Sequence, residues 1–286
     1  MKSYLKTRIC FFFAFCLFAT LAKAQSLAAP RLIVRGDDMG YSHASNVALI
    51  QAYKEGIVTS IEVLVPAPWF PEAVQLLAQN HGVDVGVHLT ITSEWDLLKW
   101  RPLTAAPSLR DSNGYLFPKV FPDKFYPKQS VAEQNWSLKE IEAEFRAQIE
   151  LAKLRIPRLS HISAHMGCTY LHKDVQEMTK RLAAEYHLLF EPEAINVSMI
   201  GFEQTPRNTK ARLVYFQQLI EKLQPGKTYL YIEHPGYDTD ELKAVHHVGY
   251  EDVAADRQSV TDIFTNAVII ALIKQKHIQL IGYNKL

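Results

Sequence analysis

The chain has 286 residues, of which 48% are hydrophobic and 21% charged, a composition typical of a globular domain. Its formal net charge is +1. That near-neutral balance gives no indication of a nucleic acid partner, because proteins that bind nucleic acids usually carry a basic patch or stripe.

The first residues have the anatomy of a secretory signal peptide. Basic side chains near the start precede an apolar run over residues 9–21, and Ala22-Lys23-Ala24 then fits a small-x-small cleavage signal. The apolar run, of about 13 residues, falls short of the roughly 20 that a membrane-spanning helix needs. We therefore expect an exported protein, periplasmic or secreted, with its signal peptide at residues 1–24 and no membrane span after cleavage.

The mature domain, expected over residues 25–286, retains a single cysteine, Cys168. One thiol cannot form an internal disulfide, so the fold must rest on its hydrophobic core. No local signature of an activated thiol surrounds Cys168, and the sequence therefore does not indicate a catalytic cysteine.

Short apolar runs alternate with amphipathic stretches along the mature chain. We expect strands at residues 32–34, 60–65, 83–89, 159–165, 228–233 and 278–283. We expect helices at residues 46–55, 71–80, 137–155, 173–186, 210–223 and 256–276. The alternation indicates an α/β fold with a parallel sheet. In this length it favours a single TIM-like (β/α) barrel, which can be irregular, with an open doubly wound sheet as the alternative.

Two local patterns refine this arrangement. Ser137 and Glu140 form a capping-box pattern at the start of the third helix. Residues 91–136 are rich in proline and aromatic side chains, and a loop that long in a compact domain is usually a functional lid or insertion. Trp95 and Trp100 in this loop could contact a ligand or pack the loop itself.

Polar side chains stand where four of the predicted strands end. These are Asp37 and Asp38, His88, His161 to His165, and Glu233 with His234. Catalytic groups of barrels with parallel strands converge at the C-terminal ends of the strands. Although each cluster alone could be a turn, a helix cap or a buried core histidine, four of them in the same structural position favour a functional site.

The residue types at these strand ends suit a divalent metal ion. At a strand end the backbone turns, so Asp37 and Asp38 can reach one pocket, where one carboxylate ligates a cation and the other accepts a proton. On a strand, His161 and His165 lie too far apart for easy chelation of one ion, at about 3.3 Å per residue. We expect His165 to bind the metal and His161 to lie deeper, or to approach the ion only through a bend in the strand. One carboxylate and two imidazoles with positions open to water make a catalytic site.

At these residues the chain resembles the YdjC-like carbohydrate deacetylase family, which includes chitooligosaccharide deacetylases. The matching segments are residues 32–40, 56–60, 85–90, 160–165, 234–236 and 280–283. Their order runs through essentially the whole mature chain, so as a set they are specific although each is short.

The resemblance implies an irregular TIM-like barrel that removes acetyl groups from N-acetylated sugars. Its metal ligands would fall on Asp38, His88 and His165, its general base on Asp37, and His234 would lie in the active-site pocket. Magnesium is the usual cofactor of the family, and the two imidazoles would also suit zinc.

The pattern of the family is not matched everywhere. Ala164 and Gly167 stand where members commonly carry Asp and His, so the resemblance does not identify the sugar. Further candidates for contacts with the substrate or the ligands are Arg35, Trp95, Trp100, His161 and Tyr237.

Three functions compete at this stage. The first is a metal-dependent hydrolase acting on linear amide C–N bonds, with Asp37 as general base and His234 as proton donor. The second is an exported carbohydrate-binding protein with a structural metal. The third is a metal-dependent phosphoesterase, whose sites often hold two metals about 3.5–4 Å apart.

Overall fold

The computed structural model describes residues 28–190, 196–201 and 205–286. The expected signal peptide, residues 1–24, lies outside the described residues. Within them, every helix is too short or too polar to cross a membrane.

One sheet organises the described chain. Its strands are β1 Arg31–Met39, β2 Ser60–Val63, β3 Asp84–Leu89, β4 His161–Ala164, β5 Leu189–Phe190, β6 Val197–Ile200, β7 Thr228–Glu233 and β8 Gln279–Leu280. Along the sheet they run in the order β5-β4-β3-β2-β1-β7-β6, and β8 pairs with the start of β1. Every registered pair is parallel, which confirms the α/β fold with a parallel sheet.

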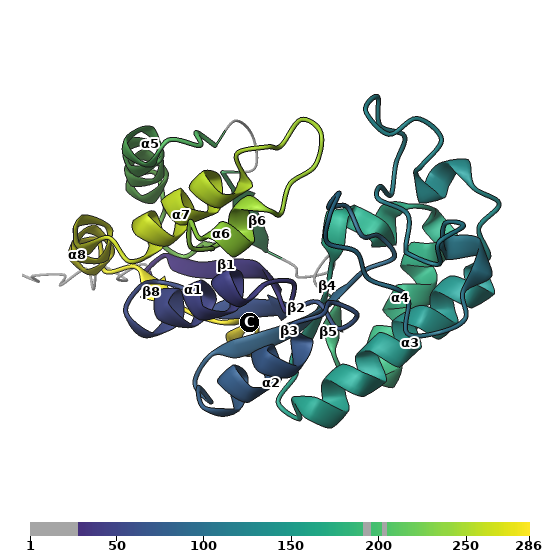
Figure 1. Ribbon diagram of the computed structural model, residues 1–286. Helices are drawn as coiled ribbons and strands as arrows, with labels where there is room; N and C mark the ends of the chain where they lie inside the picture. Colours follow the sequence, from purple (N-terminus) through teal and green to yellow (C-terminus); the bar gives the residue numbers. More distant parts are fainter. Residues whose placement is uncertain (1–27, 191–195, 202–204) are drawn as a thin grey trace, which may run out of the picture.

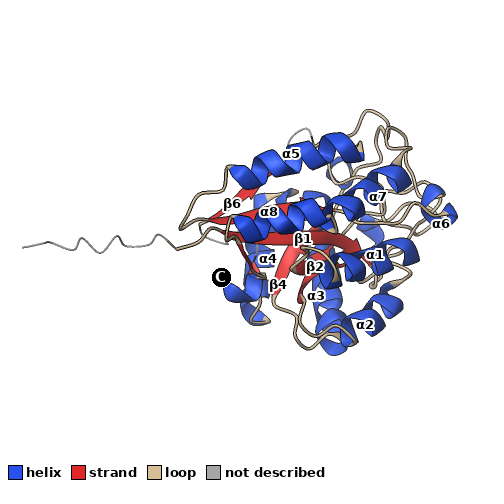
Figure 2. Cartoon of the chain, turned by 90° about the vertical axis from the view of Figure 1, so that its left-hand side faces the viewer, coloured by secondary structure: helices blue, strands red, loops and turns tan. Residues whose placement is uncertain are grey.

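Helices cover the sheet on its outside (Figures 1 and 2). They are α1 His43–Lys54, α2 Phe70–Ala78, α3 Leu138–Arg155, α4 Lys173–Glu185, α5 Thr209–Glu221, α6 Asp240–Lys243, α7 Val253–Phe264 and α8 Ala267–Gln275. Short 3-10 turns are η1 Pro107–Leu109, η2 Val131–Glu133, η3 His165–Tyr170 and η5 Tyr283–Lys285. In Figure 1, α3 and α4 pack together at one edge of the sheet, while α5 contacts α7 and α8 at the other.

The sheet is an open half-barrel, and the expected ring is not closed within the described residues. β5 and β6 end the path and do not pair with each other. The last strand, β8, instead pairs with Arg31 and Leu32 of β1, below the point at Arg35 where β2 begins to pair. Because β8 is short and pairs with β1, it cannot also pair with β5 and β6 to close the ring.

Two expected elements at the C-terminus differ in the structure. The helix expected over residues 256–276 is two helices. The first, α7, ends at Phe264 with Thr265 as its C-cap, and Asn266 caps the start of α8 by accepting a hydrogen bond from the Val268 N–H. The strand expected over residues 278–283 keeps only Gln279–Leu280, and Tyr283 lies in a 3-10 turn.

The core lies between the sheet and its helices. All residues of β2 and β3 are buried, as are all but the first of β1. Strands of parallel sheets are buried on both faces, which explains their continuous apolar runs. Four polar side chains on the inner strands interrupt these apolar runs and are fully buried, namely Ser60, Glu62, His161 and Ser163.

Candidate active site

Asp37 and Asp38 lie on β1 where its pairing with β2 is interrupted. The register shifts between Gly36 and Met39, and Asp38 has a left-handed backbone with φ of 68°. Aspartate tolerates this conformation better than most residues. The irregularity lets both carboxylates reach one cluster, where His88 Nε2 lies 3.7 Å from Asp37 Oδ2 and 3.7 Å from Asp38 Oδ1.

The structure brings Asp38, His88 and His165 together. Each offers one ligand atom, and these atoms all lie within 4.8 Å of one another. The closest pair is His165 Nδ1 and Asp38 Oδ1, at 3.1 Å. All three side chains are buried. They come from the C-terminal ends of β1 and β3 and from the turn that follows β4.

The atoms around this cluster fit a divalent cation. Asp38 Oδ1 is buried and has no hydrogen-bond partner among the described residues. Asp38 Oδ2 accepts a hydrogen bond from Arg257 Nη2 at 3.0 Å. Within the described part of the chain Asp38 Oδ1 has only ion-pair contacts with His88 and His165, and a buried carboxylate oxygen without a hydrogen bond is unfavourable unless a cation completes its surroundings. One carboxylate oxygen and two imidazole nitrogens form a donor set that zinc and related ions accept.

Each histidine of the cluster uses its other ring nitrogen for a second contact. His88 Nδ1 lies 2.8 Å from Ser163 Oγ, and His165 Nε2 lies 3.0 Å from Glu94 Oε2. Such outer partners are usual for metal-binding histidines, because they fix the ring and its tautomer. The free nitrogens of both rings therefore face Asp38.

Burial and neighbouring charges set the protonation of these groups. Burial would raise the pKa of Asp38, but His165, with Arg257, holds that pKa well below its usual value. Burial, with His165 beside it, lowers the pKa of His88. Burial would also lower the pKa of His165, yet Glu94 and Asp38 raise it to about 10. A ligating imidazole must be neutral. A metal ion bound beside Asp38 would therefore displace the proton on His165 Nδ1, the nitrogen that faces Asp38.

Arg35 forms a bidentate ion pair with the neighbouring carboxylate, that of Asp37. Its Nε donates to Asp37 Oδ1 at 2.7 Å and its Nη2 donates to Asp37 Oδ2 at 2.8 Å. Its Nη1 donates to the Tyr283 hydroxyl at 3.3 Å. This bidentate pairing fixes the plane of the carboxylate. Arg35 thus orients Asp37, which places it among the groups that support the cluster.

His234 is the most open imidazole beside Asp38. It follows β7, its Nε2 lies 3.7 Å from Asp38 Oδ2, and its side chain is 38% exposed. This exposure allows proton exchange with a bound ligand. Tyr237, three residues on, turns elsewhere: its hydroxyl donates to Gln51 on α1.

The remaining sequence candidates lie deeper. His161 is fully buried, with Nε2 2.8 Å from Glu62 Oε1. Trp95 is buried and stacks on Tyr41 with the ring centroids 5.9 Å apart. Trp100 is buried and donates to the carbonyl oxygen of Thr92 at 2.9 Å. The burial of both tryptophans favours the packing of the loop over an open surface for a ligand.

Sequence reasoning missed three charged residues of this region. Glu62 carried a signal, since a lone carboxylate in an apolar strand needs a partner. Glu94 lies in the long loop and Arg257 on α7, where nothing in the sequence sets them apart. Arg257 is buried, and its guanidinium lies over the rings of Tyr41 and Trp95, 4.7 and 5.2 Å from their centroids.

Known proteins resemble the chain over most of its length. A profile of the family described as YdjC-like protein matches residues 31–275. Carbohydrate deacetylase of Thermus thermophilus is 37% identical over 166 residues, which are 57% of this chain and 54% of that protein. The chain thus spans about half the length of that relative. Carbohydrate deacetylase 1 of Listeria innocua is 25% identical over 264 residues, covering 90% of this chain and 100% of that protein.

A solved structure has the same fold. It is described as a cellobiose-phosphate cleavage protein from Enterococcus faecalis V583, and it superposes with a TM-score of 0.72 at 23% identity. The likeness covers 90% of this chain and 99% of that chain. At that identity it bears on the fold alone.

Proposed function

Because the chain belongs to the YdjC-like protein family, we propose that it is a metal-dependent hydrolase that removes acetyl groups from N-acetylated amino sugars or oligosaccharides. The name carbohydrate deacetylase, borne by its relatives, supports the reaction class. The observation that carries the proposal is the buried cluster of Asp38, His88 and His165 with Asp37 beside it. The cluster supplies a ligand set, and Asp37 supplies a proton acceptor.

The two aspartates have different proposed roles because their oxygens have different partners. A divalent ion held by Asp38, His88 and His165 would polarise water and the acetyl carbonyl. Asp38 is committed to the ion, since its Oδ1 lies among the imidazole nitrogens of the ligand group and its Oδ2 accepts from Arg257. Asp37 is not in that ligand set, and as general base it takes the proton of the attacking water.

His234 is the proposed general acid. Hydrolysis of the amide releases acetate and an amine, and the amine nitrogen must gain a proton as its bond to carbon breaks. Among the imidazoles near Asp38, that of His234 is the one with a substantially exposed side chain. It can therefore reach a leaving group bound at the mouth of the site.

The arrangement of the site separates this proposal from its two rivals. A phosphoesterase with two metals would need a second set of ligands, whereas the described residues hold a single group of three metal-binding side chains. A binding protein with a structural metal has no use for a second carboxylate whose plane is fixed by an arginine, as Asp37 is by Arg35.

Acetate release tests the proposal directly. Purified mature protein is stripped with a chelator, reloaded with zinc or magnesium, and assayed on a panel of N-acetylated monosaccharides and oligosaccharides. Release that requires the metal supports deacetylation, and the better metal identifies the cofactor. Binding of sugars without acetate release by the loaded protein, across the whole panel, would overturn it in favour of the binding protein.

We also propose that the chain is exported, on the strength of its basic start, its apolar run and the cleavage pattern that ends at Ala24. N-terminal sequencing of protein recovered outside the cytoplasm should begin at Gln25. An intact Met1 on a cytoplasmic product would refute export without bearing on the chemistry.

A further inference from the structure

Glu62 is a buried carboxylate that the proposed chemistry does not use. It lies on β2 and is fully buried between Ile61 and Val63. Its Oε1 lies 3.0 Å from Ser60 Oγ and 2.8 Å from His161 Nε2. Its Oε2 lies 2.7 Å from Ser163 Oγ. Removing a carboxylate from water costs a large free energy. Because three side chains compensate this cost at Glu62, we ask what the buried carboxylate does for its neighbours.

Strand register places Glu62, Gly86 and His161 in one row across the sheet, and His88 and Ser163 in a second row two residues further along the strands. His88 on β3 is the register partner of Ser163 on β4, and Glu62 on β2 is the register partner of Gly86 on β3. Gly86 is also the register partner of His161. Glu62 can reach across β3 only because position 86 has no side chain: a Cβ there would collide with Glu62 Oε2 and with the His161 ring.

The contacts from Glu62 through Ser163 to His88 fix where each hydrogen atom lies. Burial would raise the pKa of Glu62, but His161 lowers it below its usual value, so the carboxylate is ionised and can only accept. The single proton of the Ser163 hydroxyl is therefore donated to Glu62 Oε2. Ser163 Oγ must then accept from His88 Nδ1, 2.8 Å away, and the N–H of the neutral His88 ring is on Nδ1.

That tautomer is the one that a metal ligand needs. With its proton on Nδ1, His88 presents the lone pair of Nε2, the atom that faces Asp38 Oδ1. The opposite tautomer would point an N–H at the same place and exclude a cation. We propose that Glu62, acting through Ser163, is the positioning residue that fixes the tautomer and direction of the His88 ring. This inference takes its ion site from the proposed function.

A purely structural role for Glu62 is the alternative to test against, because Glu62 also pairs with the buried His161. Such a role would lower stability when Glu62 is changed but would leave the proton of His88 where it is. The tautomer is thus the readout that separates the two roles.

The first experiment reads the tautomer in metal-free protein. Nitrogen-15 spectra that correlate the ring nitrogens with the ring carbon protons should show His88 protonated at Nδ1 in the unaltered chain. A proton at Nε2 would overturn the inference without any variant. Neither result depends on substrate. The inference on Glu62 can therefore fail while deacetylation is confirmed, and deacetylation can fail while the tautomer of His88 is as expected.

Glu62→Gln should move that proton. The Oε1 position receives two donors, Ser60 and His161, so the oxygen of the amide is expected to remain there. The NH2 group then faces Ser163 and donates to it, which turns the serine proton toward His88 Nδ1. The ring is forced into the Nε2–H tautomer. A spectrum unchanged from that of the unaltered chain would contradict the relay.

Zinc affinity measured by calorimetry completes the test. Glu62→Gln and Ser163→Ala should each weaken zinc binding by about 10- to 100-fold, the usual effect of an outer partner. The double variant should bind zinc as Ser163→Ala does, because Glu62 acts only through Ser163. Additive losses would show that Glu62 acts by another route and would overturn the relay.

Ser130→Ala is the matched control for these measurements. Ser130 is also a buried serine that donates to a glutamate, with its Oγ 2.6 Å from Glu133 Oε2, but it lies in the long loop. Its loss should leave zinc affinity and the tautomer of His88 unchanged. Thermal unfolding of every variant checks that the chain still folds.

Discussion

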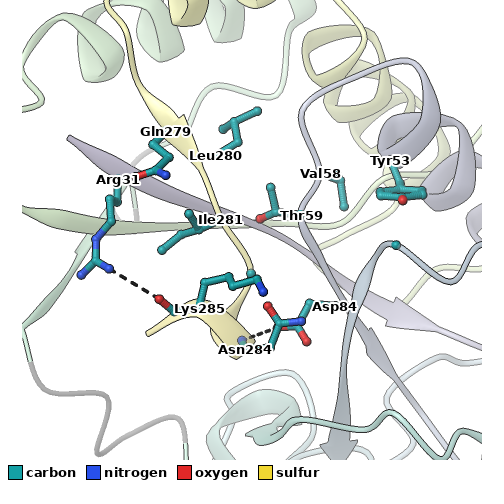
Figure 3. Close-up of a pocket in the computed structure, with 12 residues that line it drawn as sticks. Arg31, Tyr53, Val58, Thr59, Asp84, Gln279, Leu280, Ile281, Asn284 and Lys285 are labelled. Carbon is teal, nitrogen blue, oxygen red and sulfur yellow. Dashed lines mark hydrogen bonds between the residues drawn. The ribbon is translucent and has the colours of Figure 1, made fainter. Parts of the chain in front are cut away.

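The two ends of the sheet both collect polar residues, but they use them differently. At the N-terminal ends of the strands lies a cavity of about 450 Å³, bordered by Arg31, Asp84 and Lys285 (Figure 3). Arg31 donates to Thr228 Oγ1 at 2.9 Å, and Asp84 accepts from Ser160 Oγ at 2.7 Å and from the backbone N–H of Asn284 at 3.2 Å. These hydrogen bonds hold the chain together at that end.

At the C-terminal ends of the strands, a buried carboxylate oxygen has no hydrogen bond within the described residues. Asp38 Oδ1 faces two imidazole nitrogens and has no hydrogen-bond partner among the described residues. The open volume at the N-terminal ends is thus bordered by polar groups that already have hydrogen-bond partners within the fold. At the C-terminal ends a buried carboxylate oxygen has ion-pair contacts with His88 and His165 but no hydrogen bond in the part of the chain that the structure describes, so the fold only partly compensates for its removal from water.

The largest expected effect is at the C-terminal end. His88→Ala and His165→Ala should each abolish stoichiometric metal binding, and acetate release should fall to background, because three ligands cannot be reduced to two without loss of the ion. Elemental analysis and the deacetylation assay measure both. His81→Ala, in the exposed turn between α2 and β3, is the control and should keep metal and activity. Full metal occupancy in either ligand variant would remove that residue from the site.

Asp37→Asn should separate catalysis from metal binding. The amide keeps the size of the side chain but cannot accept the proton of water, so kcat should fall by roughly 10²–10⁴. Metal content and substrate affinity should change little, because the loss lies in the transition state. If the metal is lost along with activity, Asp37 is a ligand and the two aspartates have exchanged roles.

His234→Asn should have a smaller effect at the same end. Its side chain is 38% exposed, so water or buffer can partly replace it as proton donor, and kcat should fall by about 10², the lower limit for general acid catalysis. Metal content should be unchanged. Substrates with a better leaving group should be less affected, and equal losses for good and poor leaving groups would argue against proton donation.

Asp84→Asn makes the same carboxylate-to-amide change at the N-terminal end. It should lower the free energy of unfolding by about 1–3 kcal/mol, because one of its two donors then meets an NH2 group. kcat and metal content should be retained, in contrast to Asp37→Asn. Chemical denaturation measures the loss of stability. A fall in kcat comparable to that of Asp37→Asn would break the distinction between the two ends.

Much of the fold follows from local sequence patterns. Buried apolar runs separated by amphipathic helices indicate a parallel sheet, and polar residues at the strand ends place Asp38, His88 and His165 at one edge of it. The same local reasoning fails where partners are distant. Ser137 caps no N–H of α3 with its side chain, and Glu140 instead accepts from the backbone N–H of Ser108 at 2.8 Å.

The tertiary structure alone decided which polar groups meet. Glu94 from the long loop and Arg257 from α7 reach the same cluster as Asp38, although they are far apart in the chain. Glu62 reaches Ser163 because strand register sets it opposite Gly86. Periodicity assigns a residue to a strand and a face, since both depend on its neighbours in sequence. Register, and the pairing of buried polar atoms that depends on it, comes from the packing of whole strands against one another.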